Sequence, residues 1–327
     1  MDFEVSNTHG IHVTLCTRGA AIRRIETPDR FGRFSNIALS PCARDQNWPR
    51  YAYAGATLGP SAGRVPEGLL TLGGKPIALQ PNEGPHHLHG GALGLSGQDW
   101  VCEGASDTAV RFCCSLPDRW EGYPGNRLFT VTYSLDAQDA LTIRLHAESD
   151  APTWVNLSNH VYWNLSGDFS TSVASHRLLL PADTFYWNNP EHIPQAARPV
   201  AGTPFDFRRG ALLGPRLQTE NSQLAIAHGY NNAYCLAPEG APIRLSHPAS
   251  GRVLQMTTDL PAVTLYTGGY LDAGLPLEGG LTASRTCALA LEPQFCPLTR
   301  TAREAPFITA PGQPYDHWIA CQWSVNS

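Results

Sequence analysis

The chain has 327 residues, of which 42% are hydrophobic and 16% are charged, a balance typical of a folded protein with a sizeable core. The formal net charge is -5 at pH 7 and the basic residues are scattered, which argues against nucleic acid or an acidic membrane as a partner. The N-terminal residues do not resemble a signal peptide, and no apolar run could span a bilayer. Nine cysteines without zinc-type spacing indicate free thiols in a reducing cytoplasm.

Short alternating segments, separated by many of the 30 glycines and 27 prolines, take the place of long helical patterns. The clearest is a hairpin over 127–149, in which Phe129, Val131, Tyr133 and Leu135 alternate with polar residues before the turn-like "DAQD". Further strands are expected over 11–16, 110–116, 174–182, 252–259 and 262–271. This pattern predicts an all-β sandwich or barrel, and without a linker or an internal repeat we expect one domain over residues 1–327.

The motif "NEGPHHLHGG" places His86, His87 and His89 before a glycine pair. A metal site is not favoured, because the β-barrel metal proteins with His-x-His spacing also need a glutamate a few residues later. Two interpretations remain open. The histidines could lie on the surface in a glycine-rich turn, or one of them could donate a hydrogen bond to a ligand oxygen.

The motif "VNLSNHVYWNLSG", residues 155–167, reads as one strand with an apolar face and an uncharged polar face. The polar face would carry Asn156, Ser158, His160, Tyr162 and Asn164. Alternation alone favours a face that meets water. The absence of charge and the presence of asparagine, which is rare in ordinary strands, favour the wall of a polar cleft instead.

The motif "CALALEPQFCP" predicts a strand whose face combines Ala288, Ala290, Glu292 and Gln294. The two alanines leave space into which a carboxylate and an amide project, and Pro293 predicts a strand end, where sites are common. The glycine-rich segment 55–68 fits neither a phosphate-binding loop nor a dinucleotide fingerprint. The chain lacks the G-x-S-x-G motif of serine hydrolases. Glycoside hydrolysis needs two carboxylates, and the sequence does not identify a second one.

Taken in order, these motifs resemble those of the aldose 1-epimerase (galactose mutarotase) family. The ordered set comprises "GAAIRRIETPDRFGRFSNIALS", "GATLGPSAGRVPEG", "NEGPHHLHGG", "VNLSNHVYWNLSG", "VAGTPFDFRRG", "GYNNAYCL", "LYTGGYLD", "ALALEPQ" and "APGQPY". The resemblance implies a large single-domain β supersandwich with few short helices. It also implies a cytoplasmic monomer or homodimer that interconverts the α and β anomers of a free aldose without cofactor or metal.

The resemblance implies a role for each matching residue. His160 would be the acid that protonates the ring oxygen, Glu292 the base that takes the anomeric hydroxyl proton, and His89 a second imidazole near the reacting carbon. The sugar would also be contacted by Arg64, Tyr162, Asn231 and Gln294. We expect His160 and Glu292 to face one cleft, a sugar ring's width apart, and to titrate on either side of neutral pH.

Several positions depart from the family pattern and leave the sugar undefined. Gly63 stands for an asparagine, Asn231 for an aspartate and Thr264 for a glutamine, while Gly59-Pro60 replaces Gly-Arg and Pro297-Leu298 replaces Pro-Asp. An asparagine in place of an aspartate removes a charged acceptor and supplies a donor. Two other functions therefore remain open besides aldose 1-epimerase activity. The chain could be a sugar-binding protein without turnover or an isomerase of a different cyclic hemiacetal.

Overall fold

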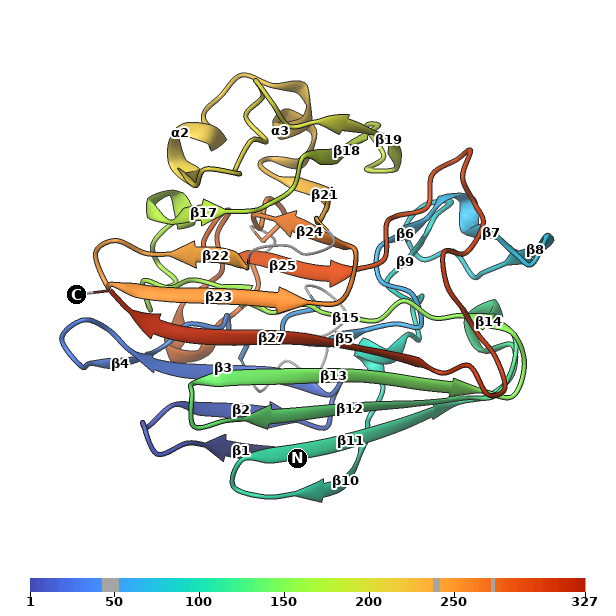
Figure 1. The fold of residues 1–327 in the computed structure, drawn as a ribbon, viewed down its shortest axis with the longest axis horizontal. Helices are drawn as coiled ribbons and strands as arrows, with labels where there is room; N and C mark the ends of the chain where they lie inside the picture. The colour runs from blue at the N-terminus through green and yellow to red at the C-terminus, as the bar shows by residue number, and fades with distance from the viewer. Residues whose placement is uncertain (43–52, 238–241, 272–273, 327) are drawn as a thin grey trace.

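The computed structural model describes residues 1–42, 53–237, 242–271 and 274–326, so Asp272, the last residue of the motif 265–272, lies outside it. The described chain contains many strands and only short helices, which confirms the all-β prediction. The described helices are short and include α2 (Leu213–Leu217) and α3 (Ser222–Ala227), which lie together at the top of Figure 1. None of the described helices has the length and apolar character needed to cross a membrane.

The largest sheet has nine antiparallel strands, which cross Figure 1 one above another. Their order is β10 (Val101–Ala105), β11 (Ala109–Leu116), β12 (Arg127–Leu135), β13 (Ala140–Ser149), β27 (Tyr315–Val325), β23 (Arg252–Thr258), β22 (Ile243–Ser246), β17 (Arg177–Leu179) and β20 (Ala211–Leu212). The predicted hairpin is β12 and β13, with Phe129 opposite Ala147 and Leu135 opposite Leu141. The prediction of this hairpin is confirmed.

A six-stranded antiparallel sheet carries much of the candidate site. Its order is β16 (Tyr162–Trp163), β25 (Leu289–Gln294), β24 (Ala262–Tyr266), β21 (Asn231–Cys235), β18 (Thr184–Asn188) and β19 (Pro194–Pro199). The strand expected over 262–271 ends at Tyr266, shortly before Gly268 adopts a φ of +68°. A left-handed residue cannot continue the ladder, so the chain turns there.

The remaining strands form a four-stranded sheet and several pairs. The sheet comprises β1 (Asp2–Ser6), β2 (His12–Cys16), β3 (Ala21–Pro28) and β4 (Phe34–Asn36). The pairs are β5 (Thr57–Leu58) with β15 (Ser158–Asn159), β6 (Arg64–Val65) with β9 (His87–Leu88), β7 (Leu69–Leu72) with β8 (Lys75–Ala78), and β14 (Thr153–Trp154) with β26 (Ile308–Thr309).

The main hydrophobic core joins the three larger sheets. A single buried cluster includes Val13 of the four-stranded sheet, Phe129 and Leu145 of the nine-stranded sheet, and Val263 and Leu291 of the six-stranded sheet. Alternate residues of β24 and β25 therefore enter this core, as the period of a strand requires. Their neighbours in sequence point to the opposite face, where the candidate site lies.

The prediction of one continuous strand over 155–165 is wrong. Ser158–Asn159 pairs with β5, whereas Tyr162–Trp163 pairs with β25 in a different sheet. The Asn159 side chain fills the break, because its Nδ2 donates to Gly55 O at 3.0 Å and its Oδ1 accepts from Val161 N at 3.2 Å. An amide side chain thus replaces ladder hydrogen bonds between the two short strands.

The interpretation that the polar face of this segment meets water is also wrong. Asn156, Ser158, His160, Tyr162 and Asn164 are all buried. Asparagine amides in this segment satisfy backbone groups; for example, Asn164 Nδ2 donates to Cys287 O at 2.7 Å. Buried polar groups need such partners because an unsatisfied one is costly.

Candidate active site

Strand register brings the predicted acid and base together. Tyr162 of β16 lies opposite Ala290 of β25 in an antiparallel pair, and His160 lies two residues before Tyr162 as Glu292 lies two residues after Ala290. Both side chains then point to the same face of the sheet. The backbone of His160 is fixed by the segment 55–56, which accepts from its N–H at 3.0 Å and donates to its carbonyl at 2.8 Å.

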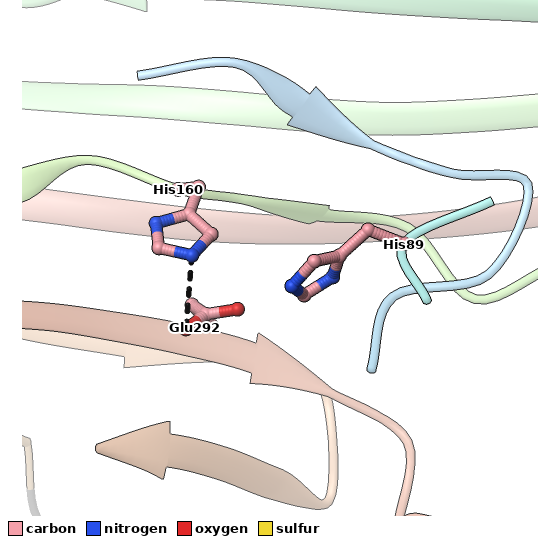
Figure 2. A group of neighbouring side chains, drawn as sticks. All are labelled: His89, His160 and Glu292. Atoms are coloured by element: carbon pink, nitrogen blue, oxygen red, sulfur yellow. Dashed lines mark ion pairs between the residues drawn. The ribbon is translucent and has the colours of Figure 1, made fainter. Parts of the chain in front are cut away.

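His160 and Glu292 form a close, buried pair. His160 Nε2 lies 3.5 Å from Glu292 Oε1, and each side chain is only 4% exposed (Figure 2). The expectation of a sugar ring's width between them is wrong. The hydroxyl oxygen and the ring oxygen that exchange protons in anomer interconversion are bonded to the same carbon, so groups serving them need only a short separation.

Burial favours the uncharged forms of both groups. Removal from water raises the pKa of Glu292 to about 8, although the charge of Arg64 partly opposes this. The same desolvation lowers the pKa of His160 to about 4. Desolvation therefore favours a protonated carboxyl beside a neutral imidazole. Transfer of one proton from Glu292 to His160 would create an ion pair without any change in net charge.

His89 presents a hydrogen-bond donor to this pair. The Gly63 N–H donates to His89 Nδ1 at 3.2 Å, so the neutral ring carries its proton on Nε2. Figure 2 shows the ring directed toward Glu292 and His160. Burial, with smaller contributions from neighbouring cationic groups, holds the pKa of His89 well below its usual range. The ring is thus a neutral donor at physiological pH.

The glycine pair after His89 has a steric cause. A Cβ on Gly90 would lie 1.8 Å from the Gly59 carbonyl oxygen, and Gly90 has a φ of +87°. His89 itself adopts a φ of +52°. The backbone can therefore pass close to the segment around Gly59 only without a side chain at position 90.

The donor set does not fit a metal ion. His89, His160 and Glu292 each offer one potential ligand atom, and these atoms lie within 4.8 Å of one another. A metal needs an imidazole lone pair, however, and the hydrogen bond from Gly63 leaves His89 with a proton on Nε2, the nitrogen that faces the pair. The geometry instead suits hydrogen bonding to a ligand oxygen.

The other two histidines of the motif have separate positions. His86 lines the cavity and its Nδ1 accepts from Glu67 N at 3.0 Å. His87 is buried behind it, with Nδ1 2.6 Å from Gln80 O and Nε2 2.9 Å from the Tyr123 hydroxyl. Because both are buried, the interpretation of surface histidines in a turn is wrong, and His87 serves the packing of this region.

The predicted site residues line one cavity of about 580 Å³, within the usual size range of small-molecule sites. They are Arg64, His89, His160, Tyr162, Asn231, Glu292 and Gln294. Residues that sequence reasoning did not nominate also line it, among them Tyr53, Glu83, Asn188, His192, Tyr266 and Tyr270. Tyr266 could have been found, because it lies two residues beyond Thr264 on the same strand face.

The wall of the cavity has fixed polar groups. Arg64 forms a two-point ion pair with Glu83, with Nε–Oε2 at 2.6 Å and Nη2–Oε1 at 2.7 Å. This pair uses two of the five guanidinium N–H groups. Gln294 Nε2 donates to Thr264 Oγ1 at 2.7 Å, which orients the amide.

The glycine at position 63 is explained by the same amide. Gly63 has a φ of +77°, and a Cβ placed on it would lie 3.0 Å from Gln294 Oε1. An asparagine here would therefore compete with the Gln294 side chain for space. The departures at positions 63 and 264 thus form one local arrangement around Gln294.

Comparison with known proteins agrees with this geometry. A family model described as aldose 1-epimerase matches residues 1–322. The chain is 33% identical over 320 residues to human galactose mutarotase, covering 96% of this chain and 92% of the human protein. It is 31% identical over 317 residues to aldose 1-epimerase from Escherichia coli strain K12, covering 94% and 91%.

Solved structures show the same fold. An aldose epimerase homologue from C. elegans superposes with a TM-score of 0.90 at 29% identity, covering 100% of this chain and 99% of that one. Galactose 1-epimerase from Lactobacillus acidophilus NCFM gives a TM-score of 0.87 at 25% identity, covering 100% and 95%. These neighbours confirm the predicted mutarotase-type sandwich. The chain belongs to the aldose 1-epimerase family.

Proposed function

We propose that this chain is a mutarotase that interconverts the α and β anomers of an aldose by acid/base ring opening and reclosure. The observation that carries the proposal is the buried His160–Glu292 pair, 3.5 Å apart at a cavity of about 580 Å³. Each positioned acid or base typically contributes a factor of about 10²–10⁴ in rate. That is sufficient for a reaction that already proceeds slowly in water.

The reaction begins with transfer of the Glu292 proton to His160, which converts the uncharged pair into a carboxylate and an imidazolium. The carboxylate then takes the proton of the anomeric hydroxyl while the imidazolium protonates the ring oxygen, and the bond between the anomeric carbon and the ring oxygen breaks. Rotation about the adjacent carbon–carbon bond turns the other face of the aldehyde toward the ring hydroxyl. Reclosure reverses both proton transfers and yields the other anomer.

The remaining residues orient the sugar. His89 donates Nε2–H to an oxygen near the reacting carbon, and the N–H groups of Arg64 beyond those bonded to Glu83 donate to ring hydroxyls. Tyr162 packs beside His160, with ring centroids 4.7 Å apart, and limits the approach of water. Asn231 and Gln294 also line the cavity. Gln294 Nε2 already donates to Thr264 Oγ1 and to Glu292 O, so Gln294 offers its carbonyl oxygen as an acceptor, whereas Asn231 offers both an amide donor and an acceptor.

The test is anomer exchange measured by polarimetry or NMR across a panel of aldoses. We expect acceleration for at least one aldose, and a loss of about 10²–10⁴-fold in kcat for Glu292→Gln and for His160→Gln. Glu220→Gln is a matched control, because Glu220 is exposed and outside this cavity, and it should leave exchange unchanged. Full activity of Glu292→Gln would contradict the mechanism. Saturable sugar binding without acceleration would identify a binding protein instead.

A further inference from the structure

A pair of cysteines continues two rows of residues that line the cavity. On β21, Asn231 and Ala233 line the cavity, and Cys235 is the next residue on the same face. On β25, Gln294 lines the cavity, and Cys296 follows two positions later, just beyond the end of the strand. Each row therefore ends in a cysteine, and the two cysteines lie at the same end of the cavity.

Strand register explains why the two thiols meet. Cys235 and Gln294 both pair with Ala262 of β24, one from each side. Ala262 carries only a methyl group, so it leaves room above the central strand for longer side chains from the flanking rows. The thiols of Cys235 and Cys296 are neighbours across this gap, where each shifts the pKa of the other, and both are partly exposed.

The surroundings divide the two thiols into a nucleophile and a proton donor. The hydrogen bond from Cys296, assisted by one from Thr184, outweighs desolvation and lowers the pKa of Cys235 to about 6. The same contact raises the pKa of the Cys296 thiol, which keeps its proton. Other cysteines differ. Desolvation raises the pKa of Cys114 and that of Cys321 to about 12.

We propose that Cys235 and Cys296 are a peroxide-sensitive thiol pair that forms a reversible disulfide at the end of the cavity. The Cys235 thiolate attacks one oxygen of hydrogen peroxide and becomes a sulfenic acid, and the departing hydroxide takes up a proton to give water. The Cys296 sulfur, on losing its proton, attacks the Cys235 sulfur and expels the second water. The two thiols lose two electrons in total, and one peroxide is reduced to two waters.

The disulfide would also reach the sugar site, a consequence that rests on the proposed function. Pro297, directly after Cys296, lines the cavity, and Gln294, two residues before it, is held by Thr264. A covalent link to β21 would restrain this segment at the binding end of the cavity and leave the His160–Glu292 pair untouched. We therefore expect the oxidised protein to show a KM for the aldose at least about twofold higher, with kcat unchanged.

The experiment treats the reduced full-length chain with one equivalent of hydrogen peroxide, blocks free thiols with N-ethylmaleimide, and maps disulfides by peptide mass spectrometry. We expect two peptides joined by a disulfide between Cys235 and Cys296, which dithiothreitol should reduce. Cys102 and Cys113 should remain free thiols after peroxide and therefore be alkylated. In Cys296→Ser, the Cys235 sulfenic acid should persist and react with dimedone. Cys113→Ser is the matched control, since Cys113 is also partly exposed, and it should leave the disulfide unchanged.

Alkylation of both Cys235 and Cys296 after peroxide would overturn the proposal, as would equal oxidation of Cys102 and Cys113. This mass-spectrometric result is independent of anomer exchange. A protein that forms the disulfide but has no mutarotase activity would refute the proposed function and leave the thiol pair standing. A protein with mutarotase activity that does not form the disulfide would refute the thiol pair and leave the proposed function standing.

Discussion

At the scale of single residues, the proton on Glu292 links the site to the stability of the fold. The pKa of this carboxyl is about 8 in the folded chain against an ordinary value of 4.5. The folded state therefore binds a proton between these two values that the unfolded chain releases. Consequently the free energy of unfolding falls as the pH rises from 4.5 to about 8, and the loss is complete above that range.

We expect Glu292→Gln to remove this loss and to stabilise the protein more at pH 8.5 than at pH 5. A shift of one pKa unit corresponds to about 1.4 kcal/mol, so the difference between the two pH values should reach a few kcal/mol. Urea unfolding of both proteins at both pH values measures it. The same stability difference at pH 5 and pH 8.5 would show that Glu292 is ionised in the folded protein.

Gly63 allows a second prediction, which tests its contact with Gln294. Gly74 provides a matched control in the same chain. Gly63 and Gly74 share a φ of +77°, but a Cβ would touch Gln294 only at position 63, and nothing lies within 4 Å at position 74. We expect both Gly63→Ala and Gly74→Ala to cost about 1–2 kcal/mol of stability from the left-handed backbone. Only Gly63→Ala should also raise the KM for the aldose, measured by anomer exchange. An equal KM in both variants would refute the contact.

The sequence could identify His160 and Glu292 as site residues, because their motifs match an ordered family pattern. It could not predict the direction of their pKa shifts. Those shifts depend on burial by residues distant in sequence, such as Tyr53 and Tyr266, whose rings lie 6.1 Å and 6.4 Å from the His160 ring. The sequence could not predict the ion pair of Arg64 with Glu83 for the same reason, since it joins two segments that are 19 residues apart.

At the scale of elements, buried asparagines tie the short strands of the site to one another. Asn156 Nδ2 donates to Ala62 O at 3.3 Å, and its Oδ1 accepts from Phe295 N at 2.9 Å. Asn156 is 1% exposed, so water cannot replace these bonds. This residue therefore connects the segment that precedes Arg64 to the end of β25.

We expect Asn156→Ala to destabilise the protein by roughly 2–5 kcal/mol, because it leaves buried backbone groups without partners. Gln195→Ala is the control. Its Nε2 also donates to a backbone carbonyl, that of Ile193 at 2.9 Å, but Gln195 is exposed and the change should stay within about 0.5 kcal/mol. Chemical denaturation measures both variants, and a loss below about 1 kcal/mol for Asn156→Ala would contradict the bridging role.

Elements were predictable from the sequence where their pairing is local. The hairpin of β12 and β13 has one buried and one exposed face, so its alternation is visible along the chain. The same pattern gave a wrong prediction for the segment 155–165. Both faces of this segment are buried, and the Asn159 side chain replaces ladder bonds at the break. Alternation cannot distinguish one long strand from two short strands in different sheets.

At the scale of the whole molecule, the core supports the proposal that residues 1–327 form one domain. The central buried cluster draws on strands from β1 near the N-terminus to β27 near the C-terminus. Both halves of the described chain contribute side chains to this cluster. A division into independent folding units would have to cut through this cluster.

We expect a single cooperative unfolding transition in urea. Fluorescence of the 8 tryptophans and far-UV circular dichroism should give coincident curves, because both report on structure that depends on the shared core. Two curves with separate midpoints would refute the single-domain proposal. Calorimetry provides the control, since the calorimetric and van't Hoff enthalpies agree only for an all-or-none transition.

The six-stranded sheet has one further consequence, for the way new specificities can arise. Val263, Leu265 and Leu291 point into the core, whereas Thr264 and Gln294 point into the cavity. Substitutions on the cavity face can therefore change the hydroxyl pattern that is accepted without repacking the interior. A combinatorial library at positions 231, 233, 264 and 294 should contain a high proportion of folded proteins. The alternation of a strand thus makes substrate choice and foldability separately adjustable traits, in natural selection and in directed evolution alike.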